Sequence, residues 1–96
     1  MSGRPAIDTA SRPMLAPHRR LHYDKARGGW TIQAPERVFL LDGPGHAIVS
    51  RCTGENAVAA IVDQLCEAYP DAPREAISAD VAALVQDLAD KGVMSL

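Results

Sequence analysis

The chain has few of the features that mark a secreted or membrane-bound protein. Its 96 residues include two cysteines, Cys52 and Cys66, too few for the disulfide framework of a small secreted domain. The longest run of strongly apolar residues is Val38–Leu41, whereas a helix that crosses a bilayer needs about 20. Arg4 is not followed by an apolar segment, so the N-terminus lacks the pattern of a secretory signal. We therefore expect a cytoplasmic protein with reduced thiols and no membrane partner.

Motifs for catalysis or metal binding are also missing. The sequence has no GxSxG, P-loop or GxGxxG pattern. Its three histidines, His18, His22 and His46, have no carboxylate or cysteine beside them at metal-ligand spacing. Cys52 and Cys66 form no CxxC motif and fall near apolar helix faces, which favours buried structural thiols. We expect no metal, no cofactor and no enzymatic activity; a small enzyme that uses one of the histidines is the alternative.

The chain also lacks the basic excess of a nucleic-acid-binding domain, because its formal net charge is −2. The charge is unevenly distributed along the sequence. Residues 1–37 hold seven Lys or Arg and three acids, a net charge of +4, whereas residues 38–96 hold three bases and nine acids, a net charge of −6. The sequence thus predicts a protein with a basic front and an acidic back.

Residues 1–16 are rich in Pro, Ser, Gly and Ala and show no apolar periodicity, which predicts a disordered N-terminal tail and a folded domain over 17–96. Alternating apolar side chains predict strands at His18–Tyr23 and Trp30–Ala34, and an apolar run predicts a third at Val38–Leu41. The turns between them are short, so the three strands should form an antiparallel meander.

The second half of the chain predicts three helices. A short helix is expected over His46–Cys52, after a turn at residues 42–45. The second and third helices carry apolar stripes at helical spacing. The stripes consist of Val58, Ile61, Val62, Leu65 and Tyr69, and of Ile77, Val81, Leu84, Val85 and Leu88. Asn56 is the expected N-cap of the second helix, and Gly92 the expected C-terminal stop of the third. The order βββααα predicts an α+β fold that is winged-helix-like, with its sheet placed first.

The third strand is apolar on both faces, which is unusual for a sheet with one face in water. We expect Phe39 and Leu41 to pack under the helices, which leaves Val38 and Leu40 to be explained. As the last strand of a meander, it should also lie at an open sheet edge. Three interpretations remain: the third helix covers Val38 and Leu40, a partner's extended peptide pairs with the edge, or the edge forms a homodimer or a domain swap.

The third helix presents acids where a DNA-reading helix needs cations. Asp80, Asp87 and Asp90 fall on its outward positions, and Arg74 and Lys91 stand only at its ends. Phosphates would be repelled by such a surface, so a peptide with basic or apolar anchors suits it better than DNA does.

A known family shares the ordered set of residues between about Pro17 and Met94. The set consists of Leu21-His22-Tyr23-Asp24, Arg27, Trp30, Ala34–Val38, Leu41, Ile48, Cys52-Thr53-Gly54, Val58, Ile61, Val62, Leu65, Tyr69, Pro70, Asp80, Val81, Leu84, Leu88, Lys91 and Gly92. In this set the chain resembles the PqqD family. The resemblance implies a RiPP recognition element without a cofactor. It also implies a peptide chaperone of pyrroloquinoline quinone (PQQ) biosynthesis, which binds the precursor peptide PqqA and presents it to the radical SAM enzyme PqqE.

The resemblance also implies a site in which the peptide adds to the third strand and lies against the third helix. Carried over by position, this site consists of Val38, Phe39, Leu40, Leu41, Asp42, Asp80, Val81, Leu84, Asp87 and Leu88. The chain departs from the family where Leu40 replaces a polar or acidic residue and where Ala57 replaces a capping Thr.

Another surface is expected to dock the enzyme, and the basic residues Arg19, Arg20, Lys25 and Arg27 are the candidates. A purely structural dimer through the edge of the third strand and a DNA-binding winged helix remain as alternatives. The chain is expected to be a monomer or a homodimer, and a hinge at residues 42–45 would allow the first strands to swap between copies.

Overall fold

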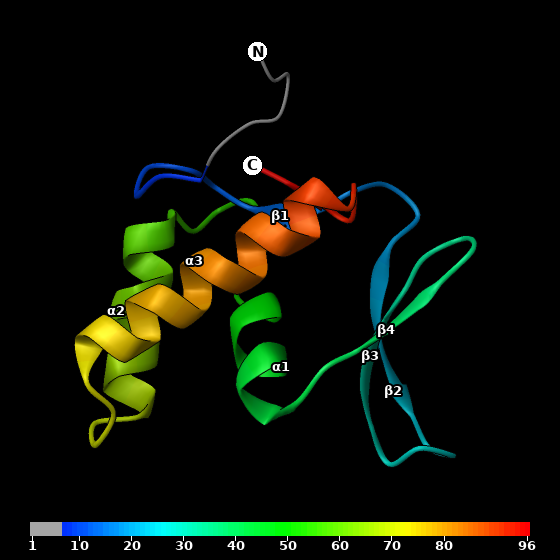
Figure 1. Ribbon diagram of the computed structural model, residues 1–96, viewed down its shortest axis with the longest axis horizontal. Coiled ribbons are helices and arrows are strands. Elements are labelled where there is room, and N and C mark those ends of the chain that lie inside the picture. Colours follow the sequence, from blue (N-terminus) through cyan, green and yellow to red (C-terminus); the bar gives the residue numbers. More distant parts are fainter. Residues whose placement is uncertain (1–6) are drawn as a thin grey trace.

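The body of the protein is a three-stranded antiparallel sheet followed by three helices (Figure 1). The computed structural model describes residues 7–96. The sheet consists of β2 (Arg20–Asp24), β3 (Gly29–Gln33) and β4 (Val38–Leu40), and the helices are α1 (Gly43–Val49), α2 (Val58–Ala68) and α3 (Arg74–Asp90). Two further strands, β1 (Met14–Leu15) and β5 (Met94–Ser95), form a small sheet of their own. The predicted α+β order βββααα is confirmed, and the likeness to a winged helix stays a prediction.

The sheet has the order β2-β3-β4, so β2 and β4 are its two edges. In its register Leu21 pairs with Ile32, and Ile32 pairs with Phe39. These three side chains share the face that packs on the core, where Ile32 is fully buried and Leu21 and Phe39 are half-buried. Side chains alternate along a strand, so Val38 and Leu40 lie on the opposite face.

Helix α1 begins earlier than the sequence predicts, at Gly43 rather than His46, and ends at Val49 rather than Cys52. The reason is an N-cap at Asp42, whose carboxylate Oδ1 accepts a hydrogen bond from the Gly45 backbone N–H at 2.6 Å. A Cβ at position 45 would lie 2.9 Å from that oxygen, so the cap requires glycine there. Pro44 in the first turn already has the φ of a helix. Residues that suit a turn thus open a helix, which lies between the sheet and the other two helices (Figure 1).

Helix α2 is capped by chain segments rather than by Asn56, so that prediction is wrong. The N-cap residue is Ala57, which offers no side-chain bond. Asn56 instead donates its Nδ2 to the carbonyl of Arg51 at 3.0 Å and so secures the preceding loop. The first N–H groups of α2, on Val58 and Ala59, donate to the backbone carbonyls of residues 11 and 9. These bonds satisfy donors that have no partner inside the helix.

The same bonds order a segment that the sequence assigns to a disordered tail. Residues 7–16 pack on the domain, contrary to the prediction for residues 1–16. Strand β1 pairs with β5, and the N–H of Ala16 donates to the carbonyl of Val93 at 2.9 Å. Backbone hydrogen bonds to residues about eighty positions away leave no periodic signal in the sequence. The order of residues 7–16 was therefore missed. The part of the prediction that concerns residues 1–6 lies outside the described residues.

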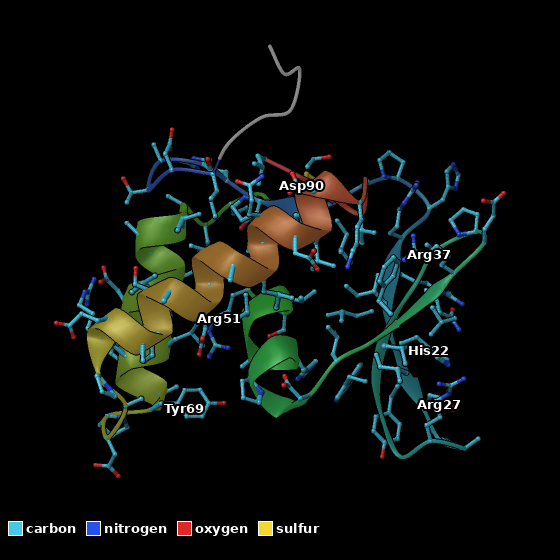
Figure 2. The ribbon with its side chains drawn as sticks, viewed as in Figure 1. His22, Arg27, Arg37, Arg51, Tyr69 and Asp90 are labelled. Carbon is cyan, nitrogen blue, oxygen red and sulfur yellow. The ribbon has the colours of Figure 1, made fainter. Side chains whose placement is uncertain are left out.

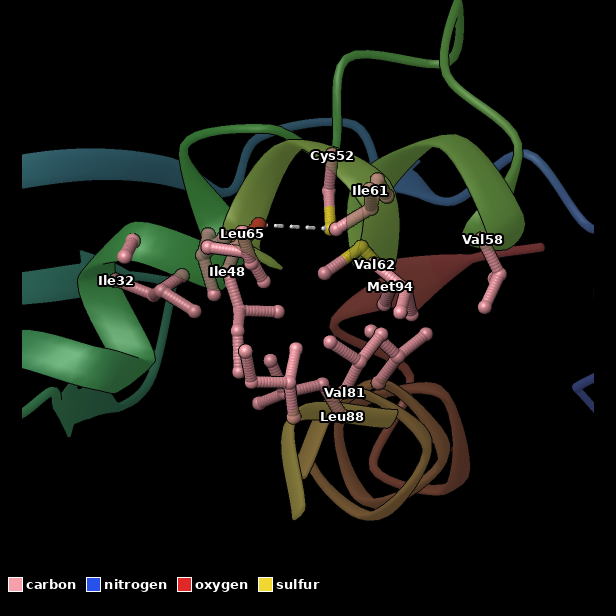
Figure 3. Packing of buried hydrophobic residues seen from close by; sticks show 14 of the residues in the cluster. Ile32, Ile48, Cys52, Val58, Ile61, Val62, Leu65, Val81, Leu88 and Met94 are labelled. Carbon is pink, nitrogen blue, oxygen red and sulfur yellow. Dashed lines mark hydrogen bonds between the residues drawn. The ribbon is translucent and has the colours of Figure 1, made fainter. Parts of the chain in front are cut away.

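The core is formed by the apolar stripes of α2 and α3, together with α1 and the inner face of the sheet (Figure 3). Ile61, Val81 and Val85 are fully buried, as their spacing predicts, whereas Tyr69 is 48% exposed. Cys52 lies in this core and its thiol donates to the carbonyl of Ile48 at 3.3 Å. Burial raises the pKa of the Cys52 thiol to about 12, so this side chain is a neutral packing group.

The end of α3 agrees with the prediction for Gly92. This residue has φ +76°, and its N–H donates to the carbonyl of Ala89. The N–H of Val93 donates to the carbonyl of Leu88, which completes a Schellman motif and buries Val93. The motif turns the chain back toward β1 and fixes the C-terminal end of α3 relative to the sheet.

Candidate functional site

The open edge of β4 presents unpaired backbone groups. Arg37 and Ala34 exchange backbone hydrogen bonds, and the N–H of Leu41 donates to the carbonyl of Trp30. Hydrogen-bonded and non-bonded pairs alternate in an antiparallel ladder, so the N–H and C=O groups of Val38 and Leu40 point away from β3. Residues 7–96 supply no partner for these groups. This edge can therefore accept another strand.

The side chains on β4 divide as the sequence predicts. Phe39 and Leu41 pack against the core, whereas Val38 is 52% exposed and Leu40 is 65% exposed. The interpretation in which the third helix covers Val38 and Leu40 is therefore wrong. Two apolar side chains flank the unpaired backbone groups, and this combination is typical of an edge that pairs with a partner.

A groove separates the end of β4 from α3. It has a volume of about 350 Å³, with β4 and the start of α1 on one side and α3 on the other. Its lining consists of Leu40, Leu41, Asp42, Pro44, Gly45, Ile48, Asp80 and Leu84. The structure thus brings five of the predicted site residues together, although the chain separates Asp42 from Asp80 by 38 positions.

Other predicted site residues lie elsewhere. Val81 and Leu88 are 0% and 3% exposed and point into the core, so they position α3 and do not reach a ligand. Asp87 pairs with Lys91 at 2.9 Å and does not line the groove. These positions were carried over from the resemblance as one stretch of helix, and a stretch of helix includes core-facing side chains as well as those that face the groove.

The groove also contains residues that sequence reasoning missed. Pro44, Gly45 and Ile48 come from α1 and form its floor. Ile48 also lines a second, mainly apolar hollow of about 170 Å³ between α1, α2 and α3. The signal was available, since Asp42 followed by Pro44 is a helix start, but the same residues were interpreted as a turn.

The four basic residues predicted to dock an enzyme do not form one patch. Arg19 and Arg20 lie where β2 begins, and Arg20 Nε donates to Gln33 Oε1 at 3.2 Å. Lys25 and Arg27 lie in the hairpin turn at the far end of β2, where Arg27 pairs with Asp24 at 3.2 Å (Figure 2). A five-residue strand is about 17 Å long, so the two pairs are separate surfaces.

The histidines show no arrangement for catalysis. His46 stacks on the Trp30 indole, with ring centroids 4.3 Å apart and an interplanar angle of 13°. Tyr23 contacts the same indole edge-on at 5.4 Å. No three His, Cys, Asp or Glu side chains among residues 7–96 converge on a point where a metal ion would bind. Nor does this part of the chain contain a helix with the length and apolarity to cross a bilayer.

Comparison with known proteins assigns the family. The family model of Coenzyme PQQ synthesis protein D (PqqD) matches residues 29–94, which contain every residue that lines the groove. The chain belongs to the PqqD family. Among its curated relatives, a protein of Bradyrhizobium diazoefficiens named PqqA binding protein is 47% identical over 90 residues, 94% of this chain and 86% of that protein. A protein of the same name from Xanthomonas axonopodis pv. citri is 38% identical over the full length of both chains.

Solved PqqD structures share the fold. The solution structure of the PqqD truncation of Methylobacterium extorquens PqqCD has a TM-score of 0.80 and 33% identity over 95% of this chain and 96% of that one. It is described as a functional, stand-alone RiPP recognition element. The crystal structure of PqqD from Xanthomonas campestris has a TM-score of 0.59 and 34% identity over 95% of this chain and all of that one. These PqqD proteins are named as binding proteins and recognition elements, not as enzymes.

Proposed function

We propose that this chain is the peptide chaperone of PQQ biosynthesis, which binds PqqA as an added strand along β4 and presents it to PqqE. Membership of the PqqD family and relatives named PqqA binding protein support the assignment to PqqA. The open edge of β4 beside the groove is the observation that carries the proposed mode of binding.

An added strand would use both parts of the site. Its backbone would pair with the outward N–H and C=O groups of Val38 and Leu40, and each such bond contributes about 0.5–1.5 kcal/mol. Every second side chain would point into the groove, toward Leu41 and Leu84. An extended peptide loses conformational entropy on binding, and a preformed strand and groove keep this loss small.

The chain supplies no chemical step in this proposal. It would hold an otherwise flexible segment of PqqA in an extended form while PqqE acts on another part of the peptide. Two surfaces are then needed, one for PqqA and one for PqqE. Arg20 and the hairpin residues Lys25 and Arg27 are exposed and lie away from the groove lining, so they are the candidates for the second surface.

An NMR titration of the isotope-labelled chain with PqqA tests this function. We expect saturable shifts at residues 38–42 and at Asp80 and Leu84, together with slower amide exchange at Val38 and Leu40. A scrambled PqqA sequence serves as the control. Saturable shifts confined to other residues would reject the strand-addition mode, and no shifts at millimolar peptide would reject PqqA as the ligand.

A second copy of the chain is the other partner that the exposed Val38 and Leu40 favour. In that case the edge would pair with itself and the protein would be a structural dimer. Light scattering over a concentration series, with and without PqqA, separates the two functions. A dimer that PqqA does not dissociate would support the structural role, whereas a monomer, or a dimer that PqqA dissociates, would support the chaperone.

A further inference from the structure

The groove beside β4 is acidic where the strand ends. Asp42 and Asp80 line it, and its described lining contains no Lys, Arg or His. Asp80 is exposed and has no ion-pair partner within residues 7–96, and Asp42 uses one carboxylate oxygen to cap α1. Leu84 and Ile48 form the adjacent apolar wall. Two carboxylates beside an apolar wall suit a Lys or Arg side chain, whose methylene stem packs while its charge stays at the surface.

The opposite end of the same strand is basic. A hollow of about 300 Å³ lies between the β3–β4 turn and the end of α3, and Arg19, Arg37 and Lys91 line it together with Glu36. The guanidinium of Arg37 lies 4.7 Å from the centre of the Phe39 ring, which holds it over this strand.

Arg19 also lines this basic hollow, and its Nη1 donates to the backbone carbonyl of Pro17 at 2.7 Å. The Nε atom of Arg19 is buried and has no acceptor among the described residues. Because this N–H is buried, an incoming carboxylate would meet the positive charge of the Arg19 guanidinium rather than the N–H itself. Arg19, Arg37 and Lys91 outnumber Glu36 in this hollow even though Lys91 also pairs with Asp87, so the hollow suits an anionic side chain.

The two ends belong to a single track. Arg37 and Asp42 flank β4, and Lys91 and Asp80 lie at the matching ends of the α3 segment that faces it. Five residues of extended chain span about 17 Å. The eleven steps along the helix axis from Asp80 to Lys91, the C-cap of α3, also span about 17 Å. The strand and the helix run in opposite directions, so their acidic ends, Asp42 and Asp80, lie together. Their basic ends, Arg37 and Lys91, lie together about 17 Å away.

We infer that this track selects a peptide segment with a cationic side chain at one end and a carboxylate four to six residues away. The cation lies beside Asp42 and Asp80, and the carboxylate beside Arg37 and Lys91. This inference rests on the proposed function, because it specifies the charge pattern of the PqqA segment that pairs with β4.

Charge reversal at each end tests the inference with PqqA as the probe. Asp80→Lys and Arg37→Glu should each weaken PqqA binding about fivefold at 20 mM salt, and the effect should shrink at 500 mM salt because these charges are exposed and screened. Glu67→Lys and Lys25→Glu make the same charge changes outside the track, and both should change the affinity by less than twofold. Arg37→Lys keeps the charge and should restore binding.

The signs of the two effects decide the outcome. Tighter binding by Arg37→Glu would mean a uniformly basic peptide, and tighter binding by Asp80→Lys a uniformly acidic one; either result overturns the inference. Effects equal to those of the control variants would also overturn it, while leaving the proposed function intact. If the unmodified chain itself did not bind PqqA, the proposed function would be rejected instead. Backbone NMR spectra of each variant confirm that the fold is retained.

Discussion

The two edges of one sheet differ in what they offer a partner. The outer face beside the β2 edge carries Arg20 and His22, and Arg20 is tied to Gln33. The outer face beside the β4 edge carries Val38 and Leu40, which are exposed and apolar. In natural sheets, charged side chains on an edge strand hinder its pairing with another chain. Of these two edges, only β2 carries such a side chain within the strand.

The surroundings of the edges differ in the same way. β4 leads directly into α1 and faces α3 across the groove, so an added strand would have a second wall to contact. β2 ends in an exposed hairpin turn at Asp24 and Arg27. A single sheet can therefore disfavour strand pairing at one edge and allow it at the other. The difference depends on a few side chains, Arg20 and His22 at one edge and Val38 and Leu40 at the other.

Removal of one N–H from the β4 edge should have the largest effect on this difference. Leu40→Pro deletes an outward donor and places a ring against the incoming strand, so PqqA affinity should fall about tenfold. The ladder to β3 should persist, because the bonds to β3 come from positions 37, 39 and 41. Isothermal titration calorimetry measures the change.

Two variants control this experiment. Leu40→Ala removes the side chain but keeps the N–H, and it should weaken binding by no more than about threefold. Tyr23→Pro deletes an outward N–H from the β2 edge and should leave PqqA affinity within about twofold. Equal losses in Leu40→Pro and Leu40→Ala would show that the side chain, not the backbone, makes the contact.

Truncation of an apolar side chain on each side of the molecule should have a smaller effect. Leu84→Ala removes apolar surface from the groove wall, so PqqA affinity should fall about fivefold. Leu21→Ala, under the β2 edge, should lower the free energy of unfolding by about 2 kcal/mol and leave the affinity unchanged. Urea unfolding and calorimetry on both variants separate the two effects. A loss of affinity in Leu21→Ala would show that the sheet, and not the groove alone, responds to the peptide.

Charge reversal on the β2 side should have the smallest effect. It should weaken the binding of PqqE and leave the binding of PqqA unchanged. Lys25→Glu combined with Arg27→Glu should weaken PqqE binding about threefold, since exposed charges contribute little each. Arg20→Glu tests the other end of the strand, and Arg19 is left unchanged because it lines the basic hollow beside Phe39. Biolayer interferometry measures PqqE binding, and a parallel PqqA titration should show no change. If all three reversals left PqqE binding unchanged, this side of the sheet would not be the docking surface.

Much of the fold could be predicted because its signals are local. Leu21 and Ile32 alternate with polar neighbours and face the core, and Gly92 ends α3 in the conformation that its position requires. What was missed depends on distant contacts. The pairing of Met14 with Ser95 joins the two ends of the chain through backbone bonds, which no side-chain pattern records.

The site was predicted in part for the same reason. The apolar residues of β4 signalled an unusual edge, and Asp80 and Leu84 of α3 do face it across the groove. Val81 was included because the resemblance to the PqqD family carries over this part of α3 as a whole, yet its side chain is fully buried. Pro44 and Gly45 were missed because the start of α1 depends on a cap at Asp42, and the same residues are also a common turn sequence.

In the proposed mode of binding, Asp42 makes both folding and peptide recognition depend on one carboxylate. One of its oxygens starts the helix that connects the sheet to the rest of the molecule, and its charge lies at the acidic end of the groove. An apolar replacement would loosen the helix and change the groove together. An asparagine would keep the capping oxygen and remove only the charge. The set of side chains that evolution can test at this position is therefore smaller than either role alone would allow.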